Sequence, residues 1–121
     1  MLSPHFSLSE LTRTQIKNYS YTNSLVSPDI EANLRRLCLE LLEPIRDAYG
    51  FPVYVNSGYR CRQVNRAVGG SPRSYHLFGR AADVRGNDLF RFRNVVRDLV
   101  DSHVIRPLEY IEYSTFIHLA L

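Results

Sequence analysis

The sequence lacks any apolar run that approaches the roughly 18 residues a membrane-spanning helix needs. Its first ten residues, MLSPHFSLSE, also lack the charged and then apolar pattern of a secretory signal. We therefore expect no membrane span and synthesis in the cytoplasm. Any export must then depend on another route or on a partner.

Cysteine is scarce as well, with only Cys38 and Cys61 in the chain, so no disulfide framework is visible. Cys38 lies on the apolar side of a predicted helix and is expected to be a small core residue. Cys61 follows a predicted strand. A disulfide between the two stays open, and so does Cys61 as a nucleophile paired with a histidine. A metal site explains the histidines better.

The composition suits one folded domain, residues 1–121, with one hydrophobic core. The hydrophobic fraction is 45% and the charged fraction 22%, which is ordinary for a globular fold. The net charge of +3 comes mostly from arginine and is too small to choose between nucleic acid, an anionic membrane and an acidic wall polymer. No nucleic-acid recognition motif is present, so we expect no nucleic-acid partner.

Helix signals are clear in the first half of the chain. Ser7 and Glu10 predict a capping box at the start of a short helix. Residues 14–26 are polar and predict a loop. Ser27, followed by a proline and an aspartate, predicts the start of a long amphipathic helix that ends at Gly50, with a kink at Pro44.

Strand signals dominate the second half. Apolar and β-branched runs predict strands at residues 51–56, 81–84, 108–112 and 116–121, of which the last two form a hairpin. A short helix is expected at 61–68, and a longer one after an Asn87 cap. Together these elements predict an α+β domain with a small, mostly antiparallel sheet flanked by helices.

Three side chains have the character of metal ligands. His76 and Asp83 are seven positions apart, a spacing at which a loop entering a strand can bring both to one point. His118 lies in an apolar strand, where a polar group needs a partner. Singly, each has a plainer interpretation: a surface histidine, a strand-end aspartate and a hydrogen-bonded core histidine. Jointly, two imidazoles and a carboxylate suit zinc and leave a fourth position for water.

Two further residues are candidates for catalysis. A general base must reach the water, and Glu109 and Glu112 are the available carboxylates, on opposite faces of their strand. We choose Glu112, six residues before His118 across the predicted turn; a solvated carboxylate is the alternative. Arg60 has a guanidinium suited to a substrate carboxylate or carbonyl; a surface ion pair is the alternative.

The stretch SGYRCRQVNRAVGGSPRSYHLFGRAAD at 57–83 and the late IEYSTFIHL resemble the D-Ala-D-Ala carboxypeptidase-type zinc peptidases. The likeness extends to the N-terminal HFSLSELTRT, as in short single-domain phage and bacterial relatives. It implies a hedgehog/D-Ala-D-Ala peptidase-like fold and a monomer. The implied activity is zinc-dependent hydrolysis of amide bonds in peptidoglycan stem peptides, at the cell wall.

By this resemblance the zinc ligands are His76, Asp83 and His118, and the catalytic residues are Glu112 and Arg60. The implied substrate-binding residues are Ser57, Tyr59, Arg60, Ser74 and Tyr75. The sequence departs from the pattern at Tyr75, where glutamine is common, and at Cys61 and Phe116, which replace serine and tryptophan.

Several alternatives stay open. One alternative is a non-catalytic wall-binding module that keeps the fold, and another is a basic nucleic-acid-binding domain. Carboxypeptidase, dipeptidase and endopeptidase sites share one ligand set, and cobalt or manganese accept similar donors.

Overall fold

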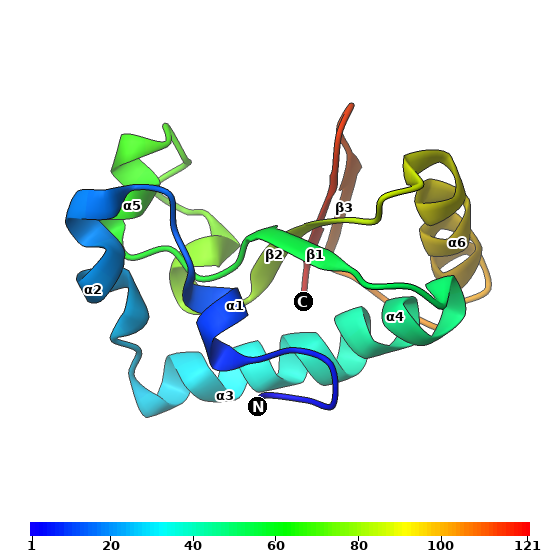
Figure 1. Ribbon diagram of the computed structural model, residues 1–121, viewed down its shortest axis with the longest axis horizontal. Coiled ribbons are helices and arrows are strands. Elements are labelled where there is room, and N and C mark those ends of the chain that lie inside the picture. Colours follow the sequence, from blue (N-terminus) through cyan, green and yellow to red (C-terminus); the bar gives the residue numbers. More distant parts are fainter.

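In the computed structural model, which describes residues 1–121, a four-stranded antiparallel sheet lies across a long, interrupted helix (Figure 1). The strand order is β1-β2-β4-β3. The strands are β1 (Tyr54–Ser57), β2 (Ala81–Arg85), β3 (Glu109–Glu112) and β4 (Ile117–Ala120). The last two form the predicted hairpin. The α+β class and the antiparallel sheet are therefore confirmed.

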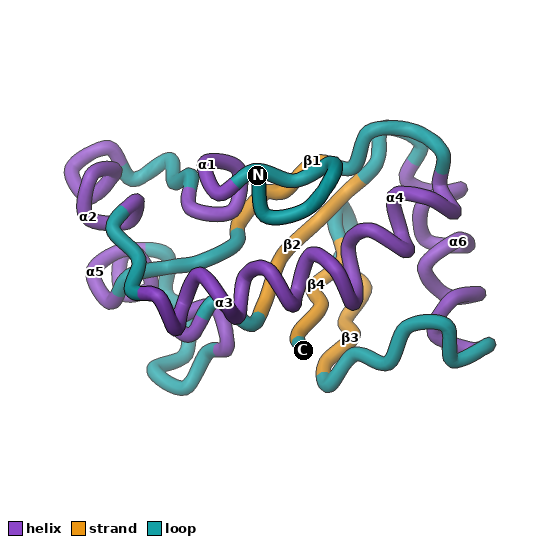
Figure 2. Tube along the Cα trace, turned by 90° about the horizontal axis from the view of Figure 1, so that it is seen from below, coloured by secondary structure: helices purple, strands orange, loops and turns teal.

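The long helix runs beneath the strands in three parts, α3 (Pro28–Leu37), a π-helical turn (Cys38–Leu42) and α4 (Glu43–Tyr49) (Figure 2). Both predicted ends are confirmed. The Ser27 hydroxyl accepts a hydrogen bond from the Ile30 amide, and Gly50 ends the helix with a φ of 79°. The π-helical turn ends two residues before Pro44, which has no amide hydrogen to donate. The wider turn thus lies where the proline was expected to disturb the helix.

The N-terminal segment contains more helix than predicted. The capping box of Ser7 and Glu10 opens α1 (Leu8–Thr12), as expected. The loop predicted for residues 14–26 is wrong in part, because it holds a 3₁₀ turn (Lys17–Tyr19) and α2 (Ser20–Ser24). These turns are short and polar, so no apolar periodicity announces them in the sequence.

Three further elements complete the fold: α5 (Arg62–Ala67), the 3₁₀ turn η3 (Tyr75–Phe78) and α6 (Leu89–Asp101). The helix at α5 was expected. The cap of α6 is Asp88 rather than the predicted Asn87, because the Asp88 carboxylate accepts the Arg91 amide at 3.1 Å. No helix combines the length and apolar character required to cross a bilayer.

The two faces of the sheet carry different side chains. Ala82 and Val84 of β2 and Ile117 and Leu119 of β4 are fully buried and pack in one cluster with the apolar side of the long helix. The alternate residues of these strands project from the opposite face. Alternation thus reserves one face for the core and leaves the other for polar side chains.

Both cysteines are buried and free, so the disulfide that the sequence left open does not form. Cys38 belongs to the core cluster, as expected. Burial is the main cause that raises the pKa of its thiol to about 12. Cys61 makes no hydrogen bond to a histidine; its backbone amide donates to Asn23 and its carbonyl accepts from the Asn65 amide. Its geometry therefore does not support a cysteine–histidine nucleophile.

Candidate metal centre

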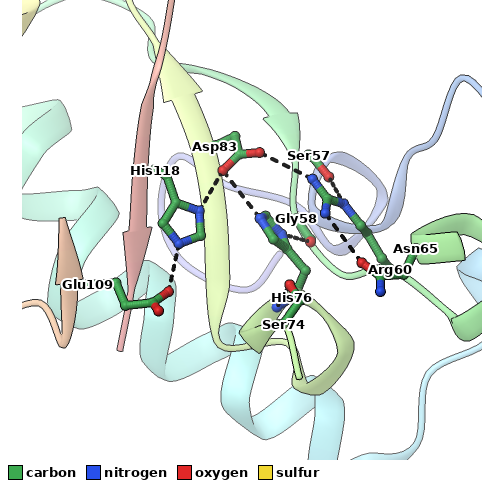
Figure 3. Close-up of polar contacts among 9 residues, drawn as sticks. All are labelled: Ser57, Gly58, Arg60, Asn65, Ser74, His76, Asp83, Glu109 and His118. Atoms are coloured by element: carbon green, nitrogen blue, oxygen red, sulfur yellow. Dashed lines mark hydrogen bonds and ion pairs between the residues drawn. The ribbon is translucent and has the colours of Figure 1, made fainter. Parts of the chain in front are cut away.

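The three predicted ligands converge on one point (Figure 3). Asp83 of β2 and His118 of β4 are direct partners in the antiparallel register and therefore share a face of the sheet. His76 approaches from η3. The Asp83 Oδ1 lies 2.8 Å from His118 Nδ1 and 3.2 Å from His76 Nε2. Residues separated by 35 positions in the chain thus meet at a single carboxylate oxygen.

The His76 ring is held at Nδ1, the nitrogen that points away from Asp83. Its Nδ1 lies 2.7 Å from the backbone carbonyl of Gly58 and the side chain is almost fully buried. A carbonyl only accepts, so Nδ1 carries a proton and donates. Nε2 then faces Asp83 either with a second proton, which it donates, or with a lone pair available to a metal cation. Gly58 has a packing reason too, because a Cβ there would lie 2.4 Å from the Leu11 carbonyl oxygen. The glycine of SGYR lets the backbone approach α1 and hold the histidine.

The His118 ring is held at both nitrogens, because its Nε2 lies 2.8 Å from Glu109 Oε1. The hydrogen bond to Asp83, together with the one to Glu109, raises the pKa of His118 despite its burial. A donor at Nε2 and either a proton or a metal cation at Nδ1 are compatible with this arrangement. A carboxylate that accepts from the far nitrogen of a ligand histidine is the usual support of a metal centre.

Asp83 is ionised in this setting. Burial works to raise its pKa, but hydrogen bonds and charge from the two histidines outweigh burial and lower the pKa to about 2. Its second oxygen, Oδ2, lies 3.3 Å from Nη2 of Arg60. One oxygen therefore faces the histidines, and the other faces the arginine predicted for substrate.

These residues fit a divalent metal ion by their chemistry. One ligand atom from each of His76, Asp83 and His118 lies within 4.8 Å of the others. Two of them are imidazole nitrogens whose other nitrogen is already engaged, and the third is an anionic oxygen. Two nitrogens and one oxygen are donors that zinc accepts, and three protein ligands are typical of its catalytic sites.

A family model described as peptidase M15 matches residues 4–120. The chain belongs to the peptidase M15 family. Peptidases of this family are typically zinc-dependent, and the resemblance seen in the sequence is thereby confirmed. No curated protein matches the chain.

In this M15 chain Glu112 does not reach the ligand cluster, which corrects the position expected for it. Glu112 pairs in register with the buried Ile117 and faces α6, where its carboxylate lies 2.6 Å from Nε of Arg97. It also accepts a hydrogen bond from Tyr110. The bond from Arg97 is the main cause that lowers the pKa of Glu112 to about 2. Its carboxylate is therefore engaged away from the candidate metal centre.

The carboxylate that does reach the cluster is Glu109. His118 pairs with Ile111, so the odd-numbered residues of β3 share its face, and Glu109 is one of them. The sequence placed Glu109 and Glu112 on opposite faces correctly, but the choice between the faces depended on the hairpin register. The alternation of His118 with two core residues in β4 was the signal that could have decided it.

Arg60 is supported by Ser57, which the family resemblance assigns to substrate binding, and by two asparagines with no role expected from the sequence. Its Nε donates to Ser57 Oγ at 3.0 Å and its Nη1 to Asn65 Oδ1 at 3.4 Å. The fully buried Asn23 binds the residues on either side of Arg60, since it donates to the Tyr59 carbonyl at 3.1 Å and accepts from the Cys61 amide at 2.7 Å. No pattern in the sequence marks Asn23.

The other predicted substrate residues have different surroundings. Tyr59 lies beside Arg60 in the wall of an adjoining cavity. Ser74 caps η3 by accepting the His76 amide at 3.2 Å, so its contact in the structure is with its own chain. The Tyr75 ring lies beneath the Arg80 guanidinium at 4.9 Å. Contact of these side chains with substrate stays a prediction.

Proposed function

We propose that the protein is a zinc-dependent peptidase that hydrolyses amide bonds in peptidoglycan stem peptides. One observation carries the proposal: His76 Nε2 and His118 Nδ1 face the same oxygen of Asp83, while the other nitrogen of each ring is held by an acceptor. Two imidazoles set in this way around an anionic oxygen favour a cation. Membership of the M15 family supports a peptidase.

His76, Asp83 and His118 would hold the zinc ion. When bound, zinc lowers the pKa of a coordinated water and polarises a carbonyl group. The Gly58 carbonyl and the Glu109 carboxylate keep the two rings in the required orientation. The three ligands project from β2, β4 and η3, so their arrangement is set by the folded domain.

Arg60 would bind the substrate. Its guanidinium is ionised and only partly exposed, and its contacts with Ser57, Asn65 and Asp83 fix its orientation beside the ligand cluster. A fixed guanidinium can hold a peptide carbonyl or a terminal carboxylate through two parallel hydrogen bonds. Arg60 would thus orient the amide that is to be cleaved.

Glu109 would accept and return the proton. Of the three strand carboxylates, Asp83 is a proposed ligand and Glu112 faces α6, so Glu109 is the one left on the reacting face. Its side chain is 40% exposed, which leaves it access to substrate and solvent. Its Oε1 accepts from His118 Nε2, the ring nitrogen remote from the ligand cluster, so the side chain would turn toward the cluster to take a proton from water and deliver it to the leaving amine.

Digestion of purified peptidoglycan fragments, followed by mass spectrometry of the products, tests the proposal. We expect new amine and carboxyl ends, loss of activity with a chelator and recovery with zinc. His118→Ala should be inactive, whereas the exposed His103→Ala should match the wild type. Fragment binding without cleavage would instead make the domain a wall-binding module. If the fragments are neither bound nor cleaved, the proposed substrate is wrong.

A further inference from the structure

A cavity of about 790 Å³ opens beside Arg60 and is lined by two kinds of side chain. Three of them are guanidinium groups, those of Arg60, Arg62 and Arg66. Ligand pockets commonly have volumes of about 300–1,000 Å³, so the cavity is large enough for several atoms of a peptide. We call it the arginine pocket.

Two of the three arginines in the pocket have no acidic partner, whereas Arg60 is paired with Asp83 outside the lining. None of its ten lining residues is an aspartate or a glutamate. Arg62 and Arg66 are one helical turn apart on α5, so their side chains lie on the same side of that helix. Neither takes part in any of the ion pairs that other arginines form. The two uncompensated guanidinium groups, those of Arg62 and Arg66, favour an anionic ligand.

Part of the lining is apolar. Ile30 of α3 and Leu77 and Phe78 of η3 form this part, and Phe78 is 51% exposed. An exposed phenylalanine beside a cavity gives an aliphatic group a surface on which to lose contact with water. The pocket therefore suits a ligand that carries both a carboxylate and an aliphatic portion.

Arg60 joins the arginine pocket to the candidate metal centre. Its Nη1 is near Asn65 in the pocket wall, and its Nη2 lies 3.3 Å from Asp83 Oδ2 (Figure 3). A ligand in the pocket therefore lies next to the ligand cluster. We infer that the arginine pocket binds the free carboxylate of an acidic peptide and thereby selects substrates with that group near the cleaved bond. This inference rests on the proposed function.

The carboxylate has two sources in a peptide, a side chain or the C-terminus. Four acetylated tetrapeptides separate them: one with Glu at an internal position, its Gln counterpart, and each of these with a free or an amidated C-terminus. Binding is measured by calorimetry on protein prepared without metal, which separates pocket binding from turnover. The carboxylate that the pocket recognises should tighten binding roughly fivefold over its amide counterpart.

Variants assign the effect to the pocket. Arg62→Ala and Arg66→Ala should each remove most of the preference for that carboxylate, because each deletes one guanidinium from the wall. Arg106→Ala, an exposed arginine outside the pocket, is the charge-matched control and should keep the preference. Equal binding of all four peptides would overturn the inference, as would an Arg106→Ala effect as large as that of the pocket variants.

Other outcomes separate this inference from the proposed function. A carboxylate preference that depends on Arg62 and Arg66, in a protein that cleaves no peptide, would keep the pocket and reject the peptidase. Cleavage with no preference between acid and amide would do the reverse. Stronger binding of a short oligonucleotide than of any peptide, lost in the same variants, would assign the pocket to phosphate and overturn the inference.

Discussion

The Glu109 carboxylate lies 2.8 Å from Nε2 of His118, whereas the carboxylate of Glu112, on the same strand, contacts Arg97 on the other face of the sheet. The two glutamates differ in position by three residues, which on a strand means opposite faces. Their contacts predict different roles: Glu109 in the proposed chemistry, and Glu112 in fixing the hairpin to α6.

Glu109→Gln should lower kcat by about 100-fold or more, because a general base commonly contributes 10²–10⁴-fold and the amide cannot accept the proton. Its carbonyl oxygen can still accept from His118 Nε2, so zinc content should stay at the wild-type level. Glu109→Ala removes both functions and should also weaken zinc binding roughly 10–100-fold. Steady-state kinetics and metal analysis measure the two effects.

Glu112→Gln is the matched control for this pair. It should leave kcat within about twofold of the wild type, because the Glu112 carboxylate contacts Arg97 and no residue of the ligand cluster. An inactive Glu112→Gln that still folds and binds zinc would return the base to Glu112 and reject the assignment of Glu109.

Zinc removal should lower the melting temperature. An ion that binds only the folded chain stabilises it by about 4 kcal/mol when its free concentration is 1,000 times its dissociation constant. Thermal unfolding with zinc and with a chelator should therefore differ in the wild type. The difference should vanish in Asp83→Ala and persist in Asp101→Ala, an exposed aspartate outside the cluster. A zinc-induced shift that survives Asp83→Ala would place the ion elsewhere.

Asn23→Ala should lower the free energy of unfolding by about 3 kcal/mol, because it leaves buried polar groups without partners. Asn23 donates to the carbonyls of Thr12 and Tyr59 and accepts the Cys61 amide. Urea unfolding gives the value. The exposed Asn18→Ala, in the same segment, should change it by less than about 0.5 kcal/mol. Equal effects at the two positions would show that Asn23 does not hold this region together.

Glu43 should make stability depend on acid. Burial opposes its ionisation, but hydrogen bonds from Ser3 and His5 outweigh burial and lower its pKa below the ordinary 4.5. Since the folded pKa is depressed, the stabilisation is present above pH 4.5 and is lost as the pH falls through the folded pKa. The stability gap between wild type and Glu43→Gln should therefore shrink on going from about pH 6 to about pH 3.

The matched control for this pH effect is Glu40→Gln, an exposed glutamate on the same long helix. Unfolding by urea at each pH gives the two gaps. If the Glu43→Gln gap stays constant across this range, the hydrogen bonds from the N-terminal segment do not depress the pKa of Glu43.

Local chemistry made many elements predictable. Ser7 with Glu10 and Ser27 with Pro28 are caps that act within one turn, and Gly50 ends a helix by its own backbone freedom. The hairpin of β3 and β4 is likewise a contact between neighbours in the chain. Where the decisive contact was distant the predictions failed, as at α2, whose Asn23 is bound by residues from α1 and from the start of the SGYR loop.

The sequence by itself determined the donor types, His76, Asp83 and His118, and the short spacing of the first two. Only the tertiary structure decided which carboxylate accompanies them, because the strand register selects the face on which each side chain projects. It also gathered Arg60, Arg62 and Arg66 around one cavity, since residues from α3, α5 and η3 close that cavity only after the chain has folded. Caps and turns depend on neighbours in the chain, whereas a site depends on neighbours in space.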